Sequence, residues 1–298
     1  MKLLNDYLKE EYGCKVYKLS LQLDVTCPVR DGRLDTRGCI FCSAGGSGEF
    51  AADRNKSVTE QIVEAKERVS SKAGRDAKYI AYFQSFTGTY GDIGYLEKAY
   101  REALACEEIV ALSIGTRPDS ISEEMYGLLK ELNLIKPVWI ELGLQTIHPE
   151  TAKYIRRGYE LPVYDECVKR LRSMGITVIV HVILGLPGES IEDMKGTVRY
   201  VCGSGIQGIK LQLLHVLKGT DLYDDYKKGL FDVMSMEEYL ELLRQILPLI
   251  PDSVVIHRLT GDGPKRILEA PLWTADKKKV MNEIGRIIKE TMEPVKKI

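Results

Sequence analysis

The chain has 298 residues, of which 44% are hydrophobic and 29% are charged, so its composition is that of an ordinary globular protein. The formal net charge of −1 gives no general attraction to nucleic acid and argues against a large polynucleotide as the substrate. There is no apolar run that could span a bilayer and no signal-peptide pattern at Met1, so we expect a cytoplasmic protein without a membrane partner. Seven cysteines without a repeating spacing fit a reducing compartment better than a disulfide scaffold.

Strand-like and helix-like segments alternate along the chain. The polar lead-in is expected to be a short helix that ends at Gly13. Ser120, with Glu123 three residues on, is expected to cap the helix that begins near it, and the segment 221–231 fits neither pattern. Further helices are expected at 57–69, 93–106, 161–174, 191–203, 235–247 and 275–289. Strands are expected at 16–25, 78–84, 109–114, 138–144, 176–184, 209–217 and 253–259.

Strands that alternate with helices at this spacing predict a parallel sheet with helices on its outer side. Six such repeats and a short seventh strand are fewer than the eight of a closed barrel. We therefore expect an α/β fold, a partial (β/α)6 TIM-type barrel with a C-terminal strand and helix added. No linker-like stretch divides the chain, so we expect one domain over 1–298, with the barrel at about 15–220 and the extension at about 221–298.

Three of the seven cysteines, Cys27, Cys39 and Cys42, lie on the loop after the first expected strand. Thiolates at this density either bind a metal or pair covalently. A tetrahedral zinc site needs four ligands, and no fourth Cys or His lies nearby, so zinc would require the distant Cys14. Three thiolates instead suit a [4Fe–4S] cluster with one iron left open. A non-catalytic zinc-binding module therefore stays an alternative at this point.

Three cysteines on the first loop of an α/β chain resemble the radical S-adenosylmethionine (SAM) superfamily. Its usual spacing is three residues and then two, whereas eleven and then two residues separate the cysteines here. The long insert resembles that of the YhcC-like branch, which is related to the elongator-type radical enzymes. The resemblance implies that Cys27, Cys39 and Cys42 hold a [4Fe–4S] cluster and that SAM binds its open iron. It also implies an electron donor such as flavodoxin or ferredoxin, and cleavage of SAM to methionine and a 5′-deoxyadenosyl radical.

The ends of the expected strands are candidates for binding SAM, because reactive groups lie at the C-terminal ends of the strands in a parallel barrel. Glu141 and Gln145 alternate onto one face of their strand. In the superfamily a polar residue there holds the ribose of SAM, and the alternative is a hydrated polar core. The stretch from His181 to Glu189 resembles the adenine-binding segment, whereas residues 83–86 replace the usual Gly-Gly-Glu. By this resemblance the cofactor-binding residues are Gln84, Thr116, Glu141, Gln145, His181, Ile183, Gly185 and Leu217.

All four histidines lie in or just after expected strands, which indicates a polar mouth to the barrel. Arg117 suits a bidentate pair with a carboxylate of SAM or substrate, and equally a structural ion pair. A mouth with groups of both signs suits a small modified nucleoside. Within its branch the chain is similar to the queuine-salvage lyases, so we expect release of queuine from queuosine or its 5′-phosphate. The alternative is a tRNA-modifying radical enzyme. Unless they only support the barrel rim, the expected substrate contacts are Arg117, His148, His215, His257 and Asp262.

Overall fold

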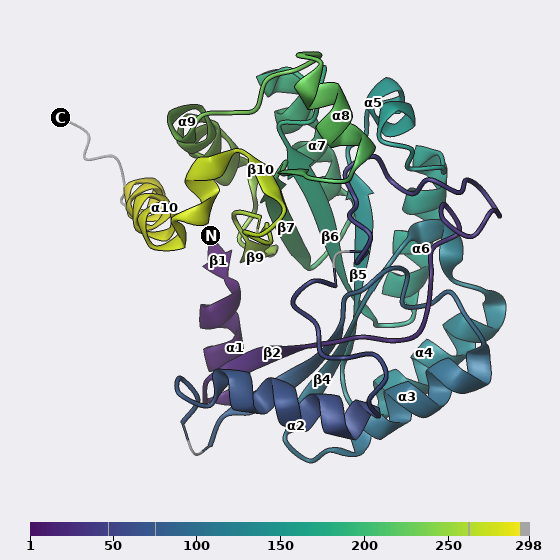
Figure 1. Cartoon of the computed structure of the whole chain (residues 1–298). Helices are drawn as coiled ribbons and strands as arrows, with labels where there is room; N and C mark the ends of the chain where they lie inside the picture. The colour runs from purple at the N-terminus through teal and green to yellow at the C-terminus, as the bar shows by residue number, and fades with distance from the viewer. Residues whose placement is uncertain (47, 75, 262, 293–298) are drawn as a thin grey trace.

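Eight parallel strands make one curled sheet, an incomplete barrel, in this computed structural model, which describes residues 1–46, 48–74, 76–261 and 263–292 (Figure 1). Their order in the sheet is β1-β9-β7-β6-β5-β4-β3-β2. The expected partial (β/α)6 barrel is therefore confirmed, and β9 with the short β1 extends it past β7. The strands span Lys2–Leu3 (β1), Val16–Leu21 (β2), Lys78–Phe83 (β3), Ile109–Thr116 (β4), Val138–Gln145 (β5), Thr177–Leu184 (β6), Gly208–Leu213 (β7) and Val255–Arg258 (β9).

Helices between the strands cover the outer side of the sheet (Figure 1). Apolar residues on their inward faces and on the outward faces of the strands form the largest core cluster. None of the helices within the described ranges is both long and apolar enough to cross a bilayer. The helices span Leu4–Tyr12 (α1), Val58–Val69 (α2), Ile93–Ala105 (α3), Glu123–Ile135 (α4), Pro149–Tyr154 (α5), Leu161–Ser173 (α6), Ile191–Gly203 (α7), Asp221–Lys227 (α8), Met236–Ile246 (α9) and Lys277–Met292 (α10).

Three segments differ from the expectation. The expected strand at 209–217 divides into β7 and a separate strand β8 (Val216–Leu217), because β8 leaves the barrel to pair antiparallel with β10 (Leu268–Ala270). Ser122, and not Ser120, caps α4, since its hydroxyl accepts the Met125 N–H at 3.1 Å. The segment that fitted neither pattern contains α8. These differences affect connections around the barrel, whereas the order of its strands is as expected.

The inside of the barrel is apolar at its N-terminal end and polar above it. Ile80, Ala111, Trp139 and Ile179 lie near the beginnings of their strands and pack against Leu8 of α1, which closes this end. Because successive side chains of a strand point to opposite faces, the next inward position on each strand lies two residues further on. Those positions hold polar side chains, which are Lys18, Tyr82, Ser113, Glu141, His181 and Lys210.

Candidate functional site

A cavity of about 380 Å³ opens at the C-terminal ends of the barrel strands. Its walls come from the cysteine loop, from the ends of the strands and from the segment that follows β9. This volume is in the range of small-molecule sites. The fold thus brings together predicted residues that are far apart in the sequence. Those that line the cavity are Cys27, Cys39, Cys42, Gln84, Thr116, Arg117, Glu141, Gln145, His181, Ile183, His215 and Leu217.

Arg30, which lies in the insert between Cys27 and Cys39, connects the insert to the end of the cysteine loop. Its guanidinium donates hydrogen bonds to the backbone carbonyl oxygens of Cys42 at 2.9 Å and of Ser43 at 2.6 Å. Gly38 leaves room for it, because a Cβ at this position would lie 2.9 Å from Nε of Arg30. The turn from Cys39 to Cys42 is closed by a hydrogen bond of 3.0 Å from the Cys42 N–H to the Cys39 carbonyl. The insert therefore has a defined path that brings both cysteines to the cavity.

None of these three cysteines forms a disulfide, and each is partly exposed. Cys27 Sγ lies 2.9 Å from the Thr87 hydroxyl oxygen. Burial raises the pKa of the Cys27 thiol and raises the pKa of Cys39 to about 12. These two thiols are therefore protonated in the metal-free chain at neutral pH. Because metals bind the thiolate, loading a metal centre on this loop must release their protons.

A zinc site completed by Cys14 does not fit this geometry. Cys14 precedes β2, whereas Cys27 lies beyond the other end of that strand and lines the cavity. A six-residue strand that rises about 3.3 Å per residue separates the two ends by roughly 20 Å. Zinc–thiolate bonds are about 2.3 Å long, so Cys14 is out of reach. In the part of the chain that the structure describes, no three His, Cys, Asp or Glu side chains form a group that could hold one metal ion.

Glu141 is buried in the polar layer and accepts four hydrogen bonds. Its Oε1 accepts from Lys18 Nζ at 2.5 Å and from Ser113 Oγ at 2.7 Å, and its Oε2 accepts from His181 Nε2 at 2.7 Å and from Lys210 Nζ. Burial raises the pKa of Glu141, but Lys18 and Lys210 outweigh it and hold this pKa well below its usual range. A carboxylate has about four acceptor positions. None is therefore left on Glu141 for the ribose hydroxyl that we expected it to bind.

His181 is a neutral member of the same network. Burial, together with the charge of Lys210, lowers the pKa of its imidazole to about 4. Gln212 Nε2 donates to His181 Nδ1 at 3.2 Å, so the ring proton lies on Nε2 and points to Glu141. Both ring nitrogens thus have partners within the protein.

Several residues of the polar layer were missed by the sequence analysis. Lys210 Nζ donates to Tyr82 Oη at 3.1 Å as well as to Glu141, and burial lowers the pKa of Lys210 to about 7. The signal was present, because Lys210 and Gln212 are polar residues two positions apart within an otherwise apolar strand. That is the same alternation from which Glu141 and Gln145 were selected.

Some predicted site residues are not part of the cavity wall. The imidazole of His148 lies between α5 and α7, with Nε2 3.0 Å from the carbonyl oxygen of Asp193. The ring of His257 packs against Trp139 of the apolar end, with 5.6 Å between the ring centroids. We therefore leave both histidines out of the proposed site. The predicted residues that do not line the cavity are His148, His257 and Gly185, and Asp262 lies outside the described residues.

A family profile described as the Radical SAM superfamily matches residues 36–201, which is more than half of the chain. The chain belongs to the radical SAM superfamily. A second profile, described as the Radical_SAM C-terminal domain, matches residues 206–290.

Two relatives place this radical SAM protein more narrowly, and a solved structure shares its fold. YtqA of Bacillus subtilis is 41% identical over 283 residues, which are 95% of this chain and 88% of YtqA. YhcC of Escherichia coli K12 is 33% identical over 293 residues, which are 97% of this chain and 93% of YhcC. The structure of Elp3 from Methanocaldococcus infernus, with an N-terminal deletion, has a TM-score of 0.67 and 22% identity, covering 91% of this chain and 64% of that one. The identity to YhcC confirms the expected YhcC-like branch.

Radical SAM enzymes use a [4Fe–4S] cluster and SAM, and the residues of this chain fit both groups. Three cysteines that form no disulfide share one cavity with Gln145, whose Oε1 is buried without a hydrogen-bond partner among the described residues. A buried acceptor without a partner costs about 1–3 kcal/mol, which a bound ligand would recover. Gln145 also has a φ of +72°, a backbone conformation that is strained for a residue other than glycine. Gly143 leaves room for the side chain of Gln145, since a Cβ at residue 143 would lie 2.9 Å from Gln145 Nε2.

Arg117 forms an ion pair within this radical SAM chain. Its Nε and one terminal nitrogen donate to the two carboxylate oxygens of Asp119 at 2.9 and 2.7 Å. The bidentate fork is thus occupied, as in the structural alternative that we gave for this residue. Among the smaller influences, the charge of Arg117 lowers the pKa of Cys27 and of Cys39, against the larger effect of burial. Arg117 therefore favours the thiolates that a cluster requires.

Proposed function

We propose that Cys27, Cys39 and Cys42 hold the [4Fe–4S] cluster of this enzyme and that its substrate is a small modified nucleoside. The observation that carries the proposal is that one cavity is lined by the three cysteines, by Gln145 with its unpartnered amide oxygen, and by part of the polar layer of the barrel. The lining members of that layer are Tyr82, Glu141, His181 and Lys210. When bound, the cluster and SAM supply a 5′-deoxyadenosyl radical that takes a hydrogen atom from the substrate. A one-electron donor such as flavodoxin or ferredoxin completes the system.

The chain's own residues have separate tasks in this proposal. Gln145 accepts a hydrogen bond from a ribose hydroxyl of SAM, and the side chains of Ile183 and Leu217 provide apolar contact. Thr116 and Gln84 line the cavity at the ends of β4 and β3, where they meet the polar parts of SAM. The closed apolar end of the barrel below the polar layer limits access of water from that side.

For the substrate, we propose queuosine or its 5′-phosphate, with the glycosidic bond to queuine as the bond that breaks. Queuosine carries an amine and hydroxyl groups, and the cavity offers them both donors and acceptors, including Gln212 and His215. Removing hydrogen from the ribose would weaken the bond to the base, so a radical lyase is chemically sensible.

Replacing Gln145 with methionine is expected to weaken the binding of SAM by about three- to tenfold, the effect of one lost neutral hydrogen bond. The iron content should not change, because Gln145 is not a cluster ligand in this proposal. Equilibrium dialysis of labelled SAM against cluster-loaded protein measures the change. His148→Ala is the control, since His148 does not line the cavity. Equal affinity of the Gln145→Met variant and wild type would place the ribose elsewhere.

The substrate is tested by incubating reduced, cluster-loaded enzyme with SAM and either queuosine or queuosine 5′-phosphate. We expect free queuine by mass spectrometry, together with 5′-deoxyadenosine, and neither product from the Cys42→Ala enzyme. A parallel reaction with tRNA is included, because a nucleotide turned out of an RNA strand presents similar groups. If tRNA stimulates SAM cleavage and the free nucleosides do not, the substrate is RNA and not a small nucleoside. If SAM is cleaved but neither nucleoside nor tRNA stimulates the cleavage, queuosine is rejected as the substrate, and the proposed radical cleavage of SAM is retained.

A further inference from the structure

The polar layer of the barrel has more positive than negative groups. We call Lys18, Tyr82, Glu141, His181, Lys210 and Arg258 the floor cluster. Lys18, Lys210 and Arg258 are its basic residues, His181 is neutral, and Glu141 is its carboxylate. Since charges are costly to remove from water unless they are paired, this imbalance requires an explanation.

The single carboxylate of Glu141 already faces Lys18 and Lys210, and it cannot neutralise Arg258 in addition. Its four acceptor positions are occupied by Lys18, Ser113, His181 and Lys210, as described above. The neighbouring polar groups do not help, because Lys210 donates to Tyr82 and the Gln212 amide donates to His181. These neighbouring groups are therefore already engaged with other partners.

Arg258 lies at the end of β9 and lines the cavity. It is the register partner of Lys210 on β7, so the two basic residues face each other across neighbouring strands. No hydrogen bond or ion pair joins Arg258 to any residue that the structure describes. The positive charge of Arg258 contributes to lowering the pKa of Lys210 and of His181, which shows that its charge acts on this layer. In its charged form Lys210 has three N–H donors and uses two of them, on Glu141 and Tyr82.

We propose that Arg258 and Lys210 form a subsite for an anionic group of the substrate, either a carboxylate or a phosphate ester. The guanidinium of Arg258 offers a planar pair of donors that matches both groups, and Lys210 adds its remaining donor. Binding of one anion would offset the charge imbalance of the floor cluster and would fix how deeply the substrate enters the barrel. The inference rests on the proposed function only in that the barrel interior receives the substrate.

The test measures binding of simple anions to cluster-loaded, SAM-bound protein, with inorganic phosphate and acetate as the probes. Isothermal titration is done at constant ionic strength, which is maintained with chloride. We expect at least one probe to bind wild type, with affinity at least tenfold weaker in Arg258→Gln. Binding of phosphate alone indicates a phosphate ester, and binding of acetate indicates a carboxylate. If neither probe binds wild type, or if both proteins bind them equally, the inference is overturned.

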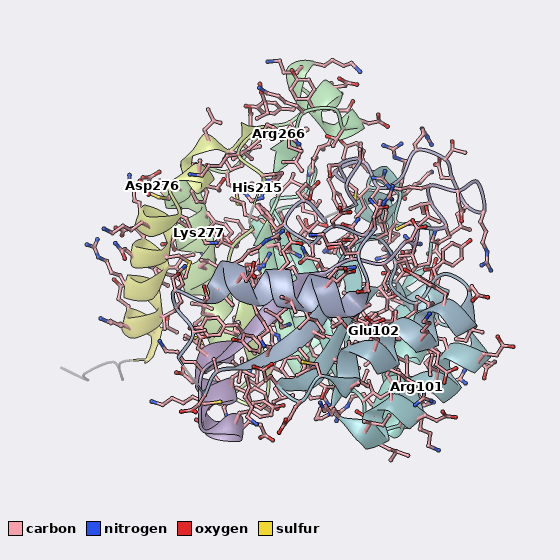
Figure 2. All side chains as sticks on the ribbon, turned by 60° about the horizontal axis from the view of Figure 1, so that its bottom comes forward. Arg101, Glu102, His215, Arg266, Asp276 and Lys277 are labelled. Carbon is pink, nitrogen blue, oxygen red and sulfur yellow. The ribbon has the colours of Figure 1, made fainter. Side chains whose placement is uncertain are left out.

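The control variant is Arg101→Gln. Arg101 lies on α3, on the outer side of the sheet and far from His215 in the view of Figure 2, and pairs with Glu97 at 2.7 Å. The Arg101→Gln variant should bind phosphate and acetate like wild type. Thermal unfolding without ligand gives a second readout, in which Arg258→Gln should melt no lower than wild type because it relieves repulsion with Lys210. A clear loss of melting temperature would assign Arg258 a structural role and overturn the inference. No turnover is measured, so a failure of the queuosine proposal would leave this result unaffected.

Discussion

Replacing Cys27, Cys39 or Cys42 with alanine is expected to abolish the iron–sulfur cluster of this protein. Wild type prepared without oxygen should contain about four irons per chain, the content of one [4Fe–4S] cluster. Each single variant should retain almost none, because a cluster held by two thiolates is easily lost. Iron and sulfide analysis, with the visible absorbance of the brown protein, measures the difference.

Two other cysteines provide matched controls for this experiment. Cys106 follows α3 and Cys202 lies on α7, and neither lines the cavity. Their alanine variants should keep the full iron content. Circular dichroism should show the same helix content in all five variants, since the three loop thiols add little to the core. Stoichiometric zinc in place of iron in the wild type would contradict the assignment.

Replacing Glu141 with glutamine is expected to lower the free energy of unfolding by about 3–5 kcal/mol, the cost of removing one partner from a buried ionic network. The amide group keeps the shape of the side chain but removes the charge that faces Lys18 and Lys210. It also turns donor hydrogens toward groups that are themselves donors, so buried partners are left unsatisfied. Urea denaturation of the metal-free protein measures the effect as a lower midpoint.

Glu123→Gln is the control for this variant. Glu123 is exposed and pairs with Arg170 on the surface, where a single ion pair contributes little. Its denaturation midpoint should stay close to that of wild type. If Glu141→Gln and wild type unfold at the same urea concentration, the buried network does not stabilise the barrel as we infer.

The order of the secondary structure could be predicted from the sequence because it depends on local patterns. The expected helix at 191–203 coincides with α7, and the expected strand at 78–84 exceeds β3 by a single residue. Errors occurred where a distant partner decides the structure. β1 has two residues and exists only because it pairs with β9, and β8 is separate from β7 because β10 lies beside it.

The cysteine loop could also be selected from the sequence, because its spacing is chemically restrictive. The path of the insert could not, since it depends on how Arg30 reaches the carbonyl groups of Cys42 and Ser43. For the same reason, the sequence could not decide whether Arg117 pairs with a carboxylate of SAM or substrate or forms a structural ion pair. Its ion pair with Asp119 is a matter of side-chain distances.

By itself, the sequence determined the parallel α/β class, the helices and strands with apolar periodicity, and the group of three cysteines. These depend on residue type and on separation along the chain. The tertiary structure alone decided which polar side chains share the interior. Lys18, Glu141 and Lys210 come from strands far apart in the sequence, and only closure of the sheet brings their charges within hydrogen-bond distance. The same closure leaves Arg258 without a partner among the described residues, because the acceptors of Glu141 are already taken.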